Sequence, residues 1–152
     1  MVYTLKQVTI RTNNTEKGMK EIDELWQDIF SGKMPILFDS NQAFQQGVSL
    51  VTKYSNYESD ENRDYDLSII SVSPYFFQDL EIKVREGLYK KYDVTDETGD
   101  MVFCVKKAWE KVWNDKRTGV ISRAYTEDYE SIVPAQYAAD KKTHCHLYIA
   151  VK

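Results

Sequence analysis

The sequence is poor in the residues that break regular structure and in cysteine, with 6 Gly, 3 Pro and 2 Cys among 152 residues. It is also 42% hydrophobic and 29% charged, which excludes a disordered or low-complexity chain. No apolar run approaches the roughly 20 residues that cross a bilayer, and residues 1–6 lack the basic start and apolar stretch of a secretion signal. We therefore expect a cytoplasmic protein, a single domain over residues 1–152, whose cysteines stay reduced.

A surplus of positive charge is also missing. Lys and Arg total 20 against 24 Asp and Glu, which gives a net charge of −4. The short basic pairs Lys90-Lys91, Lys106-Lys107 and Lys141-Lys142 stand near carboxylates, whereas a nucleic-acid surface needs clustered cations. We expect no direct nucleic-acid binding, no membrane binding and no DNA-binding domain beside the elements described below.

Motifs of common catalytic and metal sites are absent as well. The chain has no Gly-rich phosphate loop and no Gly-x-Ser-x-Gly turn. Cys104 lies between Phe103 and Val105 on a predicted helix, a buried position for a thiol. His144 and His146 share one face of a predicted strand, but a third ligand would have to come from elsewhere. We expect an ordinary strand near the surface here, and no metal or cofactor.

The first half of the chain predicts the order strand, helix, strand, strand. Asn13, Asn14 and Thr15 offer capping side chains before a helix whose apolar residues recur at steps of three and four. An acidic connection over residues 55–66 joins the last two strands. The predicted elements are a strand over 2–12, a helix ending near Ser31-Gly32, and strands over 48–54 and 67–72.

The second half predicts a similar order. Residues 80–94 alternate between apolar and polar side chains and are interrupted at Gly87, which predicts two short strands or one with a bulge. Asp100 is a plausible N-cap for an amphipathic helix over residues 102–113. Strands are expected over residues 121–133 and 146–151.

The two halves share local sequence patterns. Leu25-Trp26-x-x-x-Phe30 on the first helix matches Ala108-Trp109-x-x-x-Trp113 on the second, and Leu67-x-Ile69 matches Leu147-x-Ile149. Such repetition predicts an α+β fold of tandem duplicated βαββ units, residues 1–78 and 79–152, related by a pseudo-two-fold axis. Two antiparallel sheets with two helices would enclose a central groove. The aromatic helix residues Trp26, Phe30, Trp109 and Trp113 are expected in the cores.

The second half resembles the GyrI-like (gyrase-inhibitor-like) effector-binding domain, the ligand module of many AraC-type and MerR-type bacterial transcription regulators. The resemblance lies in the helix segment 107–113 (KAWEKVW), in Asp128-Tyr129-Glu130, in the C-terminal segment 147–151 (LYIAV) and in residues 87–92 (GLYKKY). It implies a tandem βαββ fold and an aromatic groove containing an acid that meets cationic, lipophilic ligands. Matching Asp-Tyr-Glu residue by residue makes Glu130 that acid. Family members of this length also occur as standalone proteins.

Glu130 is a candidate binding residue on physical grounds too, because it interrupts an apolar strand. A carboxylate facing an aromatic groove loses hydration, and a bound cation would offset that cost. A strand-edge glutamate facing water is the alternative, and the sequence leaves it open. The chain has 11 Tyr, 6 Phe and 3 Trp, so rings are available to line a groove. The candidate ligand-binding residues are Glu130, Tyr92, Tyr125, Tyr148 and Trp109.

The function that follows is a standalone effector-binding module for a small amphipathic or cationic organic molecule. A link to transcription regulation would need a partner protein that supplies DNA contacts. Two alternatives remain open at this point. A hydrolase of reactive small molecules would use Glu130 as base and a groove tyrosine as proton donor, and an inhibitor would bind a protein target through its surface.

Overall fold

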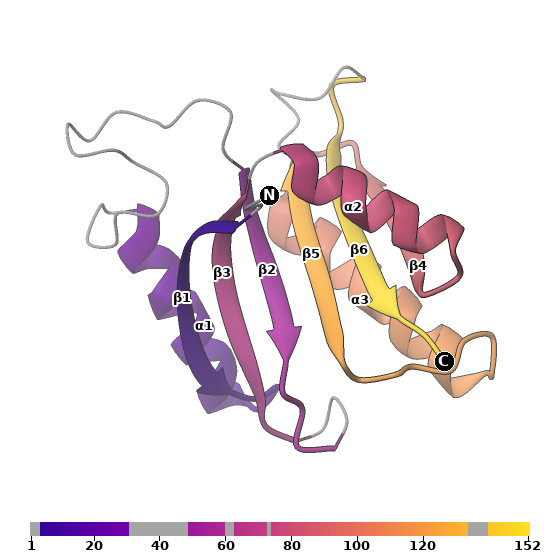
Figure 1. Ribbon diagram of the computed structural model, residues 1–152. Helices are drawn as coiled ribbons and strands as arrows, with labels where there is room; N and C mark the ends of the chain where they lie inside the picture. Colours follow the sequence, from indigo (N-terminus) through magenta and orange to yellow (C-terminus); the bar gives the residue numbers. More distant parts are fainter. Residues whose placement is uncertain (1–3, 31–48, 60–62, 73, 134–139) are drawn as a thin grey trace. The chain divides into compact units, whose positions relative to one another are not determined.

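The computed structural model describes residues 4–30, 49–59, 63–72, 74–133 and 140–152. Within these ranges the chain is a mixed α+β protein of six strands and three helices, and the strand pairings described below are antiparallel (Figure 1). The chain divides into two compact units. The first unit comprises residues 1–79 with 125–127, and the second comprises residues 80–124 with 128–152.

The first unit holds three paired strands and one helix. Its elements are β1 (Thr4–Thr12), α1 (Glu16–Phe30), β2 (Ser49–Ser55) and β3 (Tyr65–Val72). The middle strand is β3, which pairs with β1 on one side and β2 on the other. Leu25 of α1 packs with Leu67 and Ile69 of β3, so the apolar face of the helix covers this sheet. All four elements were predicted from the sequence and are confirmed.

The start of α1 follows the predicted capping chemistry. The Thr15 hydroxyl accepts a hydrogen bond from the backbone N–H of Gly18 at 3.2 Å, which satisfies one of the donors that a helix start leaves open. The predicted end at Ser31-Gly32 lies outside the described residues.

The second unit also holds three paired strands. Its elements are β4 (Tyr89–Asp96), α3 (Met101–Arg117), β5 (Glu127–Val133) and β6 (Thr143–Ala150), together with the C-terminal part of α2 (Pro74–Arg85). The middle strand is β6, which pairs with β4 and β5. Residues of α3 pack with β6 in the core, among them Cys104, Ala108 and Val112 against Leu147 and Ile149.

The helix α2 corrects the prediction for residues 80–94, and it brings the helices of the described chain to three. The alternation from Leu80 to Val84 imitates a strand. In the structure Leu80 is buried and Ile82 is 44% exposed, because the two lie about 200° apart around a helix. Gly87 adopts φ 80° in the turn between α2 and β4, where a side chain would be strained.

The structure confirms the helix predicted over residues 102–113, which is α3. The strand predicted over residues 121–133 is shorter than expected and corresponds to β5. Asp100 caps α3 by accepting a hydrogen bond from the N–H of Phe103 at 3.0 Å. Trp113 is 37% exposed instead of buried in the core. The strand expected over 121–133 begins only at Glu127, since Tyr125 has a φ of 55° that extended backbone does not allow.

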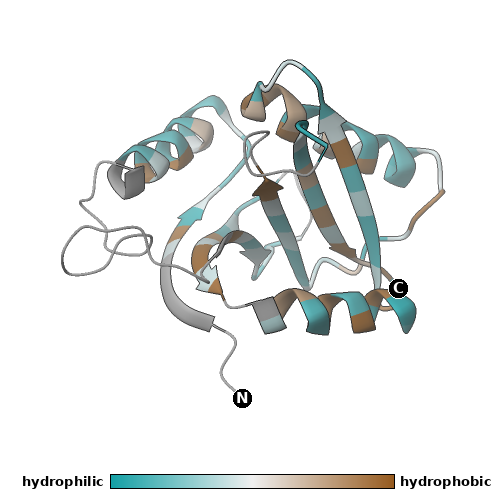
Figure 2. Ribbon diagram, turned by 90° about the horizontal axis from the view of Figure 1, so that it is seen from above, coloured by the Kyte–Doolittle hydropathy of each residue, from teal (hydrophilic) through white to brown (hydrophobic). Residues whose placement is uncertain are grey.

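Hydrophobic and hydrophilic positions alternate along the helices and strands (Figure 2). Such patterning is typical of elements that bury one face only. Among the described helices, none has both the length and the apolar character needed to cross a membrane.

Candidate functional site

The sheet of the second unit has two chemically different faces. Register places Glu130 of β5 opposite Leu147 of β6, and Tyr129 opposite Tyr148. Leu147 packs toward α3, so Glu130 belongs to this helix face. Because successive side chains on a strand alternate, Tyr129 and Tyr148 point to the opposite face, where Tyr148 reaches Glu81 of α2.

On the helix face, Glu130 is buried against tryptophan. The indole Nε1 of Trp109 donates a hydrogen bond to Glu130 Oε1 at 2.7 Å, and Glu130 is only 6% exposed. The Trp109 ring lies 6.2 Å from the ring of Trp113, one helical turn further along α3. A carboxylate is therefore fixed at the edge of a tryptophan pair, in surroundings with little water to solvate its charge.

A buried ion pair lies beside this carboxylate. Arg123 Nη2 donates to Asp128 Oδ2 at 2.8 Å, and both side chains are at most 1% exposed. Asp128 also accepts a hydrogen bond from the N–H of Ala150 at 2.8 Å. The Arg123 guanidinium lies 5.8 Å from the ring centroid of Trp109, within cation–π range.

Tyr92 also lies on the helix face but is engaged elsewhere. Its hydroxyl donates to the carboxylate of Asp115 on α3 at 2.7 Å. Burial, first of all, and this carboxylate raise the pKa of Tyr92 well above its ordinary value of 10. Tyr92 therefore fastens α3 to β4 in its neutral form.

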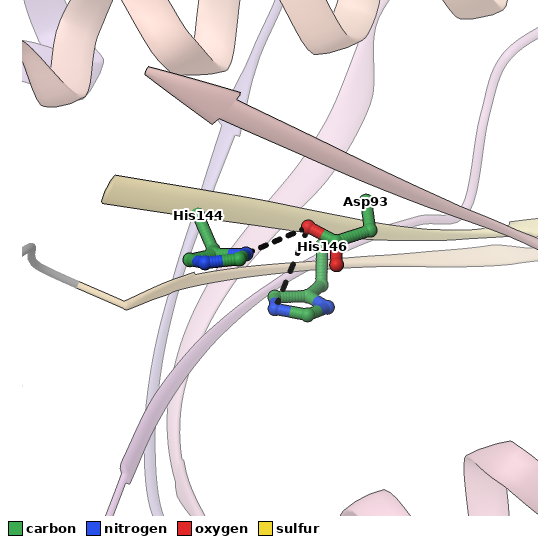
Figure 3. A group of neighbouring side chains, drawn as sticks. All are labelled: Asp93, His144 and His146. Carbon is green, nitrogen blue, oxygen red and sulfur yellow. Dashed lines mark hydrogen bonds and ion pairs between the residues drawn. The ribbon is translucent and has the colours of Figure 1, made fainter. Parts of the chain in front are cut away.

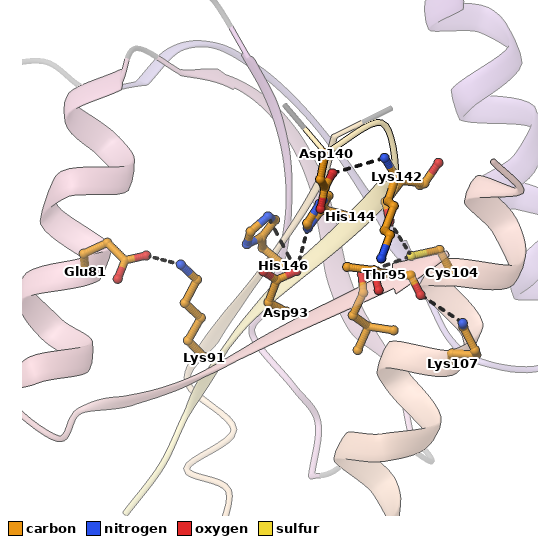
Figure 4. Close-up of polar contacts among 12 residues, drawn as sticks. Glu81, Lys91, Asp93, Thr95, Cys104, Lys107, Asp140, Lys142, His144 and His146 are labelled. Carbon is orange, nitrogen blue, oxygen red and sulfur yellow. Dashed lines mark hydrogen bonds and ion pairs between the residues drawn. The ribbon is translucent and has the colours of Figure 1, made fainter. Parts of the chain in front are cut away.

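Tyr148 lies on the opposite face in a second polar cluster. Glu81 Oε1 accepts hydrogen bonds from the Tyr148 hydroxyl at 2.8 Å and from Lys91 Nζ at 2.6 Å; Figure 4 draws the Glu81–Lys91 contact. The hydrogen bond from Lys91 lowers the pKa of Glu81. The pKa of Tyr148 is raised, chiefly by burial and then by the hydrogen bond to Glu81. The Glu81 carboxylate is therefore bonded both to an ammonium group and to a phenol.

The structure thus brings together only part of the predicted set. Glu130 and Trp109 are in direct contact, and Tyr92 shares their face of the sheet. Tyr148 is separated from them by the sheet itself. Tyr125 precedes β5 and groups with the first unit, where its ring lies 5.5 Å from that of Tyr57.

Sequence reasoning missed a partner for the two histidines. Asp93 of β4 lies opposite His146 of β6, and its Oδ1 is 2.9 Å from His144 Nδ1 and 4.0 Å from His146 Nε2 (Figure 3). Hydrogen bonds with Asp140, then with Asp93, raise the pKa of His144. Burial lowers the pKa of His146. The available signal was the alternation of Lys91, Asp93 and Thr95, which predicts one polar face along β4.

Neither cysteine thiol is accessible to solvent. Cys104 and Cys145 are fully buried in the core of the second unit. Burial is the first cause that raises the pKa of each, so neither resembles an activated nucleophile.

The chain is similar to two known proteins. It is 27% identical over 153 residues to the "Putative transcriptional regulator protein YobU" of Bacillus subtilis (strain 168), covering 93% of this chain and 88% of the relative. Its structure is similar to the crystal structure of an integron cassette protein from the mobile metagenome of Vibrio cholerae, VCH_CASS2, with a TM-score of 0.61. That likeness covers 98% of this chain and 93% of the other at 23% identity, and it shows a shared fold. No protein-family model matches the sequence.

Proposed function

We propose that this protein is a ligand-binding module of the regulator-related kind, and that it takes a small amphipathic organic cation at Glu130. The single observation that carries the proposal is the buried Glu130 carboxylate bonded to the Trp109 indole. The resemblance to GyrI-like effector-binding domains and the similarity to the Bacillus regulator point in the same direction.

The physical argument rests on the cost of burying a charge. A carboxylate in a poorly hydrated aromatic setting gains more from an organic cation than a solvated carboxylate does, because less water must be removed and screening is weaker. Trp109 and Trp113 add ring faces that attract a cation by about 0.5–2 kcal/mol. A bulky, weakly hydrated cation is favoured over Na⁺ or K⁺, which lose tightly bound water on entry.

We further propose that the chain consists of two repeated βαββ units forming a single effector-binding domain. Supporting this, the element order strand, helix, strand, strand occurs in β1–α1–β2–β3 and again in β4–α3–β5–β6. In both series the last of the three strands lies in the middle, flanked by the first and the second. Tyr92, which shares the face of Glu130 and Trp109, remains part of the proposed ligand site.

Titration with the cation methyltriphenylphosphonium tests the binding function, and quenching of tryptophan fluorescence measures the binding. The neutral analogue triphenylphosphine oxide reports the contribution of shape without charge. We expect saturable binding of the cation, and we expect Glu130→Gln to weaken it by at least about tenfold, or 1.4 kcal/mol. Glu110→Gln is the matched control, since it removes one exposed negative charge next to Trp109 in sequence.

Equal binding of the cation by the parent and Glu130→Gln would refute the electrostatic mechanism. The same variant also separates the alternatives. A hydrolase would keep its substrate affinity and lose turnover in Glu130→Gln, and a protein-binding inhibitor would depend on exposed residues instead. Control of transcription, if it is the biological role, requires a partner that supplies DNA contacts.

A further inference from the structure

Both histidines of the chain lie on one face of the paired strands β4 and β6, together with a carboxylate. The chain has 2 His in all, and His144 and His146 stand two residues apart on β6 with rings stacked at 5.7 Å. Asp93 joins them from the neighbouring strand β4 (Figure 3). The three come from paired strands, so hydrogen bonds of the backbone fix their spacing.

The donor atoms of these residues already converge. One ligand atom from each of Asp93, His144 and His146 lies within 4.8 Å of the other two. Two ligands on a tetrahedral zinc ion, each at about 2.0–2.2 Å from it, are roughly 3.4 Å apart. Small side-chain rotations therefore suffice to place the three donors around one ion. Asp93 Oδ1 lies between the two imidazoles, at 2.9 Å and 4.0 Å.

Asp140 supplies the outer contact that metal-binding histidines commonly have. His144 turns Nδ1 toward Asp93, and its Nε2 lies 2.9 Å from the carboxylate of Asp140. A carboxylate on the far nitrogen keeps the proton there and leaves the near nitrogen free to bind metal.

We propose that the second unit binds one divalent transition-metal ion of the zinc class through His144 Nδ1, His146 Nε2 and the Asp93 carboxylate, with Asp140 as a positioning residue. Imidazole and carboxylate together suit zinc and its neighbours in the first transition row, and they do not match the all-oxygen preference of Ca²⁺ or Mg²⁺. Three protein ligands leave at least one coordination position for water or an exogenous ligand.

Competing sites of the same chemistry are lacking in the chain. No imidazole exists outside this cluster, and both thiols are buried in the core. The site also stands on the face opposite to Glu130, so it neither requires nor excludes binding of an organic cation there.

Zn²⁺ titration of the whole chain by isothermal calorimetry is the first test. We expect one ion per chain with affinity in the micromolar range or tighter, and release of protons that increases as the pH is lowered toward the imidazole range. Asp140→Asn should weaken binding by about 10–100-fold. His146→Gln and Asp93→Asn, which remove ligands, should weaken it further. Glu110→Gln is the control for loss of one negative charge and should bind as the parent does.

Nitrogen NMR of ¹⁵N-histidine-labelled protein is the second test, and it keeps the proposal decidable if one variant misfolds. Zn²⁺ should shift Nδ1 of one imidazole and Nε2 of the other, in keeping with the two orientations. Absence of saturable Zn²⁺ binding would overturn the proposal. So would binding that is unchanged in both Asp93→Asn and His146→Gln, or resonances of both imidazoles that do not respond to the metal.

Discussion

Glu130 and Tyr148 point to opposite faces of the paired strands β5 and β6. Glu130 is opposite Leu147 in the β5–β6 ladder and contacts Trp109 of α3, whereas Tyr148 is opposite Tyr129 and donates to Glu81 of α2. The sheet therefore separates the polar cluster around Glu130 and Trp109 from the one around Tyr148 and Glu81. The helix-face cluster carries the proposed organic-cation site, and the other face carries the histidine pair.

Replacement of Trp109 by phenylalanine tests the hydrogen bond to Glu130. Trp109→Phe keeps an aromatic ring but removes the Nε1–H donor, so the buried carboxylate loses a partner. We expect a loss of about 1–3 kcal/mol in the free energy of unfolding, measured by urea denaturation. Trp113→Phe is the control because Trp113 is 37% exposed. Equal effects of the two substitutions would mean that ring volume, rather than the hydrogen bond, matters.

The buried pair Arg123–Asp128 should be far more sensitive than an exposed one. Asp128→Asn leaves the guanidinium uncompensated in a site where both side chains are at most 1% exposed, and we expect a loss of about 3–5 kcal/mol in unfolding free energy. Asp66→Asn breaks the exposed Arg11–Asp66 pair and should cost about 0–1 kcal/mol. Thermal and urea unfolding of both variants measure the difference. A small effect at Asp128 would show that the site rehydrates.

Stability should fall in acid partly through Glu81. The hydrogen bond from Lys91 is the main cause that lowers the pKa of Glu81 below its ordinary 4.5 in the folded chain. A carboxyl group whose pKa is lower in the folded than in the unfolded state stabilises the fold at pH values above its unfolded pKa. This stabilisation is lost as the pH falls through the pKa of the folded state. Urea unfolding at pH 7 and near pH 3 should therefore show a smaller acid-induced loss in Glu81→Gln than in the parent. An identical loss in both proteins would assign acid sensitivity to other carboxylates.

Local sequence patterns predicted most elements of the fold. Capping side chains at Thr15 and Asp100 and apolar steps of three and four identified α1 and α3, because these signals depend on neighbours within one or two turns. The same reasoning missed α2. Pro74 at a helix start, with apolar residues at Phe76, Phe77, Leu80 and Val84, was the helical signal, but the alternation of Leu80, Ile82 and Val84 matched a strand equally well.

Other features were decided only by tertiary structure. The sequence by itself determined an α+β chain, an acid interrupting an apolar strand, and two histidines on one strand face. Register then placed Glu130 toward Trp109 and Tyr148 away from both, and it brought Asp93 to the histidines from 51 residues away along the chain. A shift of one residue in strand pairing would reverse each of these placements. Strand register depends on long-range packing. The sequence therefore identified these chemical groups, whereas only the tertiary structure determined which groups contact one another.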